Sequence, residues 1–259
     1  DSNPEFIYNV ATDNGITRGL VNGDTLIGTP STTAIATTNV GTVLITQGTL
    51  INTNNTNYTI IFNNGTLTID RRPITVTAIT ETRTYNGTIE SSKTPTYTGL
   101  IAADTGKLTG LAQVFNSANA NGTNGSTLSV SAYVLDLTIS GNYTVVTINV
   151  PGTINPKPLT VSGITAENKV YDGTTTATIA GSAVFSGRVE SDDLTITTAS
   201  ISGSFSDKNV GTNKLINLSG VSLSGRDSGN YTLIGVAGVT ADITTKALTI
   251  SGITANNKT

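Results

Sequence analysis

The sequence predicts an all-β chain of tandem modules, and three observations support that prediction. Thr, Val and Ile are abundant, and β-branched side chains suit a pleated sheet better than a helix. Segments such as Leu159–Ser162 and Leu248–Ser251 alternate apolar and polar residues with a period of two. Short motifs recur at intervals of roughly 85–90 residues, the size of a small β-domain. No long segment shows the helical period of 3.6 residues.

Composition excludes most kinds of enzyme. The chain has 259 residues and contains no His, Cys, Met or Trp. Nucleophilic sites that need His or Cys are therefore impossible, as are ordinary zinc, haem and iron–sulfur sites. We expect no enzymatic activity, no cofactor and no metal.

Charge and hydropathy narrow the set of partners. Only 12% of the residues are charged, the net charge is −3 and the pI is near 4.9. A nucleic-acid-binding protein should be basic, so we expect no nucleic-acid partner. No apolar run approaches the ~18 residues of a membrane-spanning helix, and no signal peptide begins the sequence. We interpret the chain as an internal fragment of a longer protein.

Repeated motifs define the modules. Asn57-Tyr58-Thr59 recurs twice, beginning at Asn142 and at Asn230, and Tyr85-Asn86-Gly87-Thr88 returns as Tyr171-Asp172-Gly173-Thr174. A ligand-binding residue needed at one place would not be copied into every module. We therefore interpret the repeated positions as structural, and they are Tyr58, Tyr85, Tyr143, Tyr171, Asp172, Gly173 and Tyr231.

The repeat predicts three modules and the start of a fourth. Residues 1–72 form a module that lacks its first strand, residues 73–157 and 158–246 form two more, and residues 247–259 provide an opening strand. Short joints at Asp70–Pro73, Asn155–Pro158 and Thr244–Ala247 separate them. Because Pro stiffens two of these joints and no Gly/Ser linker is present, we expect an elongated rod.

The third module shows the expected architecture most clearly. We expect its strands at about 158–164, 176–181, 184–185, 194–205, 213–224 and 230–243, with tight turns between them. Short strands at this spacing predict a β-sandwich-like module. A β-grasp-like arrangement, with a short helical turn near Gly23–Thr25 and Ala103–Thr105, is the alternative.

Two motif sets resemble a known family. The segments Asn168–Thr174, Phe205–Gly211 and Gly229–Thr232 resemble YDG-type repeats, and Gly19–Thr25 with Asn64–Ile69 resembles the related MBG repeat. Such repeats occur in large bacterial surface adhesins and in exoproteins of the filamentous-haemagglutinin type. The resemblance implies a secreted or cell-surface location and supplies no catalytic residues.

Other candidate sites have structural interpretations. Asp192-Asp193, Asp207 and Asp227 lie near expected turns, where Asp caps the backbone. They lack the spacing of a calcium loop and the sugar cleft that a glycosidase needs. We expect Tyr85 and Tyr171 to hold turns at module ends, so that truncating either residue destabilises only its own module.

The resemblance and the repeat together predict a spacer that holds a distal binding region away from the cell. Its partners would be the neighbouring modules of the same chain. The alternative is a set of modules that bind host or bacterial surface glycans or proteins directly. The first module has no counterpart of the Pro158–Gly173 strand and turn, and Lys246–Thr259 repeats the start of that segment. We therefore expect an open sheet edge in the first module, and either a tail that docks on a neighbouring chain or poor order at both ends.

Overall fold

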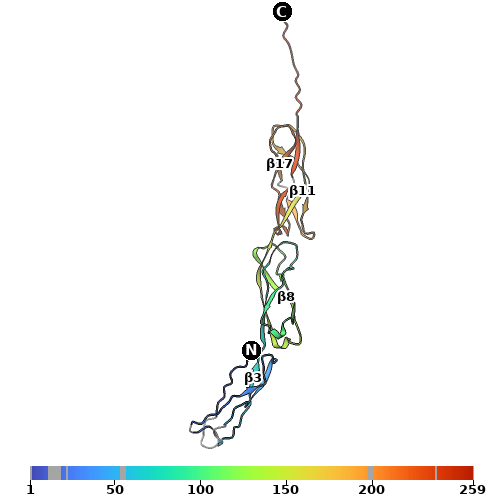
Figure 1. Cartoon of the computed structure of the whole chain (residues 1–259). Helices are drawn as coiled ribbons and strands as arrows, with labels where there is room; N and C mark the ends of the chain where they lie inside the picture. The colour runs from blue at the N-terminus through green and yellow to red at the C-terminus, as the bar shows by residue number, and fades with distance from the viewer. Residues whose placement is uncertain are drawn as a thin grey trace. The chain divides into compact units, whose positions relative to one another are not determined.

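The computed structural model describes residues 2–10, 19–21, 23–52, 57–197, 201–236 and 238–258. Asn22 of the MBG-like motif and residues 198–200 of one expected strand lie outside this part. The chain divides into two compact units. Figure 1 shows that it is built from strands and labels β3, β8, β11 and β17. Unit 1 comprises 1–77, 96–111 and 132–148, and unit 2 comprises 78–95, 112–131 and 149–259. The joint at Asp70–Pro73 therefore lies inside unit 1, and the joint at Asn155–Pro158 lies inside unit 2.

Unit 1 contains two three-stranded sheets. The first has the order β1-β2-β3 and is antiparallel, and the second has the order β6-β4-β9. In the second sheet β4 pairs parallel with β9 and antiparallel with β6. The strands are β1 (Ser31–Thr32), β2 (Gly41–Thr46), β3 (Gly65–Ile69), β4 (Arg72–Thr77), β6 (Thr96–Thr98) and β9 (Tyr143–Ile148), and the 3-10 turns are η1 (Ala102–Asp104) and η2 (Ser140–Asn142).

A four-stranded sheet of order β5-β10-β8-β7 uses two long strands that contribute residues to both units. In it β10 pairs parallel with β5 and antiparallel with β8. The strands are β5 (Thr82–Thr84), β7 (Leu108–Phe115), β8 (Gly122–Leu135) and β10 (Val150–Asn155).

Unit 2 contains three further sheets, of orders β14-β11-β19, β12-β20-β17-β16-β13 and β15-β18. The parallel pair β11–β19 repeats the parallel pair β4–β9 of unit 1. The elements are β11 (Lys157–Ala166), β12 (Lys169–Val170), β13 (Thr176–Ala177), β14 (Ile179–Ser186), β15 (Thr195–Thr197), β16 (Ser202–Phe205), β17 (Gly211–Ser219), β18 (Ser222–Ser224), η3 (Ser228–Asn230), β19 (Tyr231–Val236) and β20 (Val239–Thr244).

The two larger sheets of unit 2 share one core. Val161 of β11 packs in one buried cluster with Phe205 of β16, Ile216 of β17 and Ile243 of β20. Burial alternates along β20, where Val239, Ala241 and Ile243 are buried and the residues between them are more exposed. Two sheets that face each other across a shared apolar layer form a β-sandwich. The all-β prediction of tandem modules is confirmed.

Several strand bounds differ from the expected ones. The segment expected as one strand at 213–224 is two strands, β17 and β18, because Gly220 takes a positive φ of 74° and turns the chain. The segment at 230–243 likewise divides into β19 and β20. Residues 184–185 do not form a separate strand, since β14 runs continuously through them.

The segment that follows β20 has no regular structure in its described part. Leu248 is 87% exposed and Ile253 is 85% exposed. Their counterparts in β11, Leu159 and Ile164, are 0% and 8% exposed. The same sequence pattern is therefore buried in one place and open to solvent in the other.

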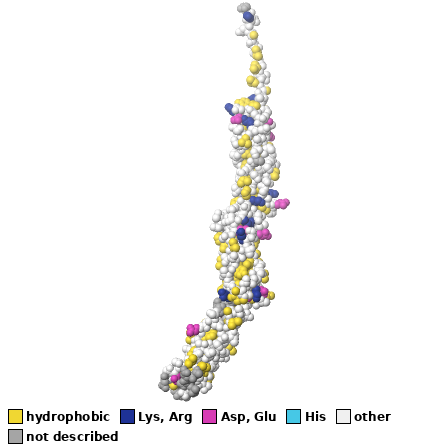
Figure 2. Space-filling model, viewed as in Figure 1, with side chains coloured by type: hydrophobic (Ala, Val, Ile, Leu, Met, Phe, Trp, Pro, Cys, Tyr) yellow, Lys and Arg dark blue, Asp and Glu magenta, His cyan; other side chains and the backbone are white. Residues whose placement is uncertain are grey.

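The surface carries few charges. Figure 2 shows Lys, Arg, Asp and Glu in small separate groups, with most of the visible face formed by uncharged polar side chains and backbone. No helix in the described residues is long and apolar enough to cross a membrane.

Candidate functional site

The described residues contain no group of acidic side chains that could hold a metal ion. The repeated contacts of the chain lie instead at the two joints and at equivalent turns. These contacts are therefore the candidate functional site, and they consist of a tyrosine–aspartate pair, an asparagine turn and a basic side chain over a phenylalanine.

The first repeated contact is a pair that we call the tyrosine clasp, in which a phenol hydroxyl donates a hydrogen bond to an aspartate. The same hydroxyl accepts a hydrogen bond from the backbone N–H three residues before that aspartate. The donor–acceptor pairs are Tyr58–Asp24 at 2.7 Å, Tyr143–Asp104 at 2.7 Å and Tyr231–Asp192 at 2.6 Å. The amides are those of Val21 at 2.9 Å, Ile101 at 3.4 Å and Val189 at 2.8 Å.

Each clasp aspartate also closes its own turn. The N–H groups of Asp24, Asp104 and Asp192 each donate to the carbonyl three residues earlier, at 3.0 Å in all three cases. The phenol thus meets a carboxylate and an amide that the turn holds together, so its donor and its acceptor are both satisfied. The same geometry occurs at three positions in the sequence, so the turn and the tyrosine form one repeated structural motif.

A glycine five residues before the aspartate permits this turn. Gly99 has φ +100° and Gly187 has φ +98°, a left-handed conformation that favours glycine. A Cβ at Gly99 would also lie 2.3 Å from the carbonyl oxygen of Pro73, and one at Gly187 would lie 3.1 Å from that of Pro158. The turn therefore rests directly on the backbone of the joint.

The clasp of the second joint holds an additional phenol. Asp192 accepts the hydroxyl of Tyr85 at 2.9 Å as well as that of Tyr231, and the two rings meet edge to face with centroids 5.5 Å apart. Both rings are buried, with Leu159 and Leu194 in the same apolar cluster. This cluster includes residues from both sides of the joint.

Burial and carboxylate contacts keep these phenols protonated. Burial, with the hydrogen bond to Asp192, raises the pKa of Tyr231 to about 12 and also raises the pKa of Tyr85. Burial and the bond to Asp104 raise the pKa of Tyr143. The neutral phenol is therefore the stable donor in each clasp.

The second repeated contact is an asparagine turn at each joint. In the first joint the Asn142 side chain accepts from the Val40 N–H at 2.9 Å and donates to Asn39 Oδ1 at 2.8 Å. In the second joint the Asn230 side chain accepts from the Ala120 N–H at 2.8 Å and donates to Asn119 Oδ1 at 3.3 Å.

Both asparagines end a 3-10 turn and directly precede a clasp tyrosine. The Gly-Asn-Tyr sequence therefore supplies two adjacent contacts to each joint. The asparagine reaches the loop of the preceding sheet, and the tyrosine reaches the aspartate turn of its own sheet.

The third repeated contact is a basic side chain over a phenylalanine. The Arg83 guanidinium lies 4.8 Å from the Phe115 ring centroid, and the Lys169 ammonium lies 5.4 Å from that of Phe205, within cation–π range. Lys169 also donates to the Asp172 carboxylate at 2.9 Å. Arg83 and Lys169 therefore stabilise two equivalent turns of the repeat, at Asn86-Gly87 and at Asp172-Gly173.

The remaining predicted positions lie in the turn at Tyr171–Gly173. Tyr171 is partly buried against the core of unit 2, and its N–H donates to the Thr244 carbonyl at 2.9 Å. The Thr174 N–H and the Lys169 ammonium hold the pKa of Asp172 at about 2. Gly173 takes φ +81°. Tyr171 does not contact a clasp aspartate, whereas its repeat counterpart Tyr85 does.

A buried polar cluster surrounds Gln113 and Glu81. Gln113 is 2% exposed, exchanges two hydrogen bonds with the Ile79 backbone and donates to Ser91 Oγ at 2.9 Å. Ser91 and Ser92 in turn donate to the Glu81 carboxylate. Burial opposes the charged form of Glu81, but the serine hydrogen bonds and Arg83 prevail and lower its pKa. A carboxylate with a lowered pKa is a poor general base. We therefore interpret the cluster as structural, because its hydrogen bonds join the backbone at Ile79 to Gln113 and the two serines to Glu81.

Sequence reasoning identified the clasp tyrosines but not their partners. It assigned Asp192 to turn capping and noted Asp24 and Asp104 only within expected helical turns. The useful pattern was the interval of five residues from Gly19 to Asp24, from Gly99 to Asp104 and from Gly187 to Asp192. The joint contacts of Asn142 and Asn230 were also missed, although both belong to the repeated Asn-Tyr-Thr motif.

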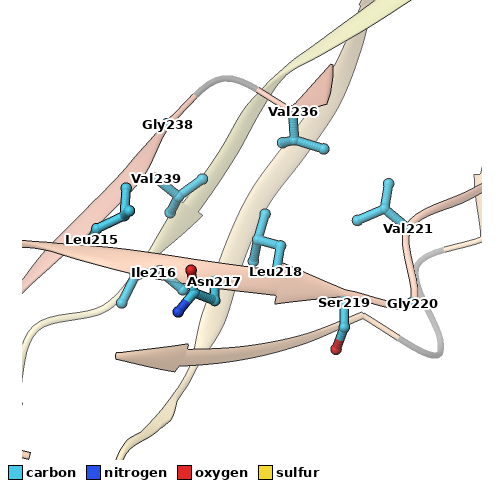
Figure 3. Close-up of a pocket in the computed structure, with 10 residues that line it drawn as sticks. All are labelled: Leu215, Ile216, Asn217, Leu218, Ser219, Gly220, Val221, Val236, Gly238 and Val239. Carbon is cyan, nitrogen blue, oxygen red and sulfur yellow. The ribbon is translucent and has the colours of Figure 1, made fainter. Parts of the chain in front are cut away.

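Two depressions lie near these elements. One of about 820 Å³ lies in unit 1 at the first joint, and its lining includes Asn39, Arg72, Asp104, Lys107 and Tyr143. The other, of about 470 Å³, lies beside β17 and β20 in unit 2. Figure 3 shows Leu218, Val221 and Val236 around this second depression, and no titratable side chain lines it.

Comparisons with known proteins agree with the repeat. The model of the YDG domain matches residues 70–150 and 155–241, and the model of the MBG domain (YGX type) matches residues 1–68. No curated protein and no solved structure matches the chain significantly. The two family matches confirm the MBG/YDG resemblance and indicate no catalytic family.

Proposed function

Because the chain belongs to the YDG domain family, with an MBG domain ahead of its two YDG domains, we propose that it is an extracellular spacer. In this role the tandem domains of a bacterial adhesin hold a more distal binding region away from the cell surface. MBG and YDG domains are typical of extracellular surface proteins. The chain would act mechanically and would catalyse no reaction.

One observation carries this proposal. At both joints the same Gly-Asn-Tyr turn bonds to the loop of the preceding sheet and to the aspartate turn of its own sheet. Contacts that recur at successive joints can set a constant geometry from domain to domain. A spacer requires such constancy, whereas a ligand-binding residue is needed in one place only. We accordingly assign the repeated tyrosines and the Tyr171–Gly173 turn a structural role.

Small-angle scattering on the 259-residue chain tests the spacer. Strands of 8–12 residues at about 3.3 Å per residue predict domains of roughly 35–45 Å, and three in series predict a maximum dimension on the order of 110–130 Å. A concentration-independent monomer of that length is the expected result. A compact particle of the same mass would contradict the proposal.

A second candidate is direct attachment to glycans or proteins. The first-joint depression favours it, because amide, carboxylate and cationic side chains of Asn39, Asp104 and Lys107 line one space of about 820 Å³. An array of glycans and matrix proteins tests this candidate with the whole chain. Binding that is lost in Lys107→Ala and retained in Lys246→Ala, a change to an exposed lysine of unit 2, would favour attachment over the spacer.

A further inference from the structure

The loop Asn209-Val210-Gly211 occupies the same place in its sheet as the two loops that receive an asparagine. Asn39-Val40 directly precedes β2, Asn119-Ala120 precedes β8, and Asn209-Val210 precedes β17. In the first two loops the second residue gives its N–H to the asparagine of the next domain. The third loop matches the first residue for residue, whereas the second has Ala120 in place of Val and one additional residue, Asn121, before its glycine.

Strand register places the third loop at a joint as well. Gly41 pairs with Ile69, and three residues later Arg72 pairs with Tyr143. At the second joint Gly122 pairs with Ile154, and three residues after Ile154, Lys157 pairs with Tyr231. Gly211 pairs with Ile243, and three residues later the chain reaches Lys246. If a tyrosine of another domain paired with Lys246 in the same register, the asparagine before that tyrosine would lie beside Val210.

The segment from Lys246 has the sequence of an opening strand. Residues 246–255 repeat Lys157–Ala166 nearly residue for residue. In β11 this sequence pairs with the tyrosine strand β19 of its own domain. Leu248 and Ile250, at 87% and 73% exposed, have no comparable burial. The occupant that satisfies this segment is therefore a domain that contains a matching tyrosine strand.

Contacts of Asp207 and Lys214 hold the backbone of the third loop in place. Asp207 accepts the Asn209 N–H at 2.8 Å, and Lys214 donates to the Asn209 carbonyl at 2.8 Å and forms an ion pair with Asp207. Lys214 holds the pKa of Asp207 below its ordinary value. Val210 is 50% exposed, and its N–H makes no hydrogen bond within the described residues. A rigid loop with an open donor loses little entropy on binding.

We propose that Asn209-Val210-Gly211 is a docking surface for the Gly-Asn-Tyr turn of a further YDG-type domain. The asparagine of that domain accepts the Val210 N–H and donates to Asn209 Oδ1, as Asn142 and Asn230 do at the two joints. This inference rests on the proposed spacer function and deepens it, because it specifies how one domain joins the next.

Amide hydrogen exchange tests the docking surface. A copy of residues 171–245 is appended after Thr259, so that residues 246–259 become the opening strand of an added domain. We expect exchange of the Val210 amide to slow by about tenfold or more, approaching the protection of Val40 and Ala120. Replacing the asparagine of the added domain that corresponds to Asn230 with Ala should restore fast exchange at Val210.

Two controls keep the test decisive. Asn142→Ala and Asn230→Ala in the original chain should accelerate exchange at Val40 and Ala120 respectively and leave Val210 unchanged. A second extended chain carries residues 85–156 in place of 171–245, in case the first added domain does not fold. If neither added domain, once folded, slows exchange at Val210, the docking surface is wrong.

Scattering on the extended chain separates this inference from the function. A longer particle whose Val210 amide still exchanges freely would overturn the docking surface and leave the spacer intact. A compact particle would overturn the spacer itself.

Discussion

The first and second joints share the same type of hydrogen bonds, but they differ in the number of phenols that their aspartate accepts and in the apolar packing around it. At the first joint Asp104 accepts one phenol, that of Tyr143, and a depression of about 820 Å³ lies beside it. At the second joint Asp192 accepts two phenols, and the Tyr85 ring packs with Leu159, Leu194 and Tyr231. The hydrogen bonds therefore define the geometry at both joints, and apolar burial adds to it at the second.

Truncating Tyr85 should have the largest effect, because it removes what distinguishes the second joint. Loss of a large buried aromatic costs about 3–5 kcal/mol, so Tyr85→Ala should lower the free energy of unfolding of unit 2 by that order. Contact with Asp192 revises the expectation that only its own module would be destabilised. Urea denaturation followed by segment-resolved hydrogen exchange should show lost protection on both sides of the joint.

The exposed Tyr133 provides the matched control, since it is 41% exposed. Tyr133→Ala should change stability little. If Tyr85→Ala removed protection only from residues 78–155, the aromatic cluster would not couple the two sides of the joint.

Removing the clasp carboxylates should have a smaller effect that still separates the joints. Leaving a buried donor without its partner costs about 1–3 kcal/mol. Asp192→Ala strands two phenols and Asp104→Ala strands one, so the first variant should lose more stability than the second. Chemical denaturation of both variants measures the difference. Equal losses would mean that Tyr85 gains nothing from Asp192.

The third effect is confined to alkaline pH. Folding raises the pKa of Tyr85, Tyr143 and Tyr231 above the ordinary value of about 10. The unfolded state then releases these protons first, so the stabilisation is complete below pH ~10 and is lost as pH rises toward the folded values. Tyrosinate absorbance should show late-titrating groups, and denaturation midpoints should fall from pH 10 upward.

Tyr231→Phe sharpens this measurement at the second joint. The variant should lose one late-titrating group and show a shallower fall in stability with pH. If the variant lost a group that titrates near pH 10 instead, the Tyr231 phenol would lie in solvent.

Much of the fold could be predicted from the sequence, because its determinants are local. The alternation in Leu159–Ser162 and the repeated Asn-Tyr-Thr motif record which side chains a strand buries. Partners were harder to predict. Asp192 lies 39 residues before Tyr231, and the residues around it differ from those around Asp104, so only the interval from a glycine remains as a signal.

The joint contacts required the fold itself. Asn230 meets Ala120 across 110 residues, and no local pattern says which end of a sheet faces a neighbour. Tyr85 and Tyr171 show the same limit. They share a motif, yet only Tyr85 bonds to a clasp aspartate. Its N–H bonds to the end of β10, which leads directly into the domain of Asp192, whereas the end of β20, to which the Tyr171 N–H bonds, leads into a segment without regular structure.

The isoleucine that pairs with the glycine of one sheet lies three residues before the first residue of the next domain's opening strand, and this spacing sets how domains can be added. A whole domain can be inserted or removed at a joint, and the new junction keeps the strand register and the asparagine contact that both joints share. A single-residue deletion there has the opposite result, because strands present alternate faces. Leu159 and Val161 would turn outward, and Thr160 and Ser162 would enter the core. Chain length is thus free to vary in complete domains and is tightly fixed in single residues.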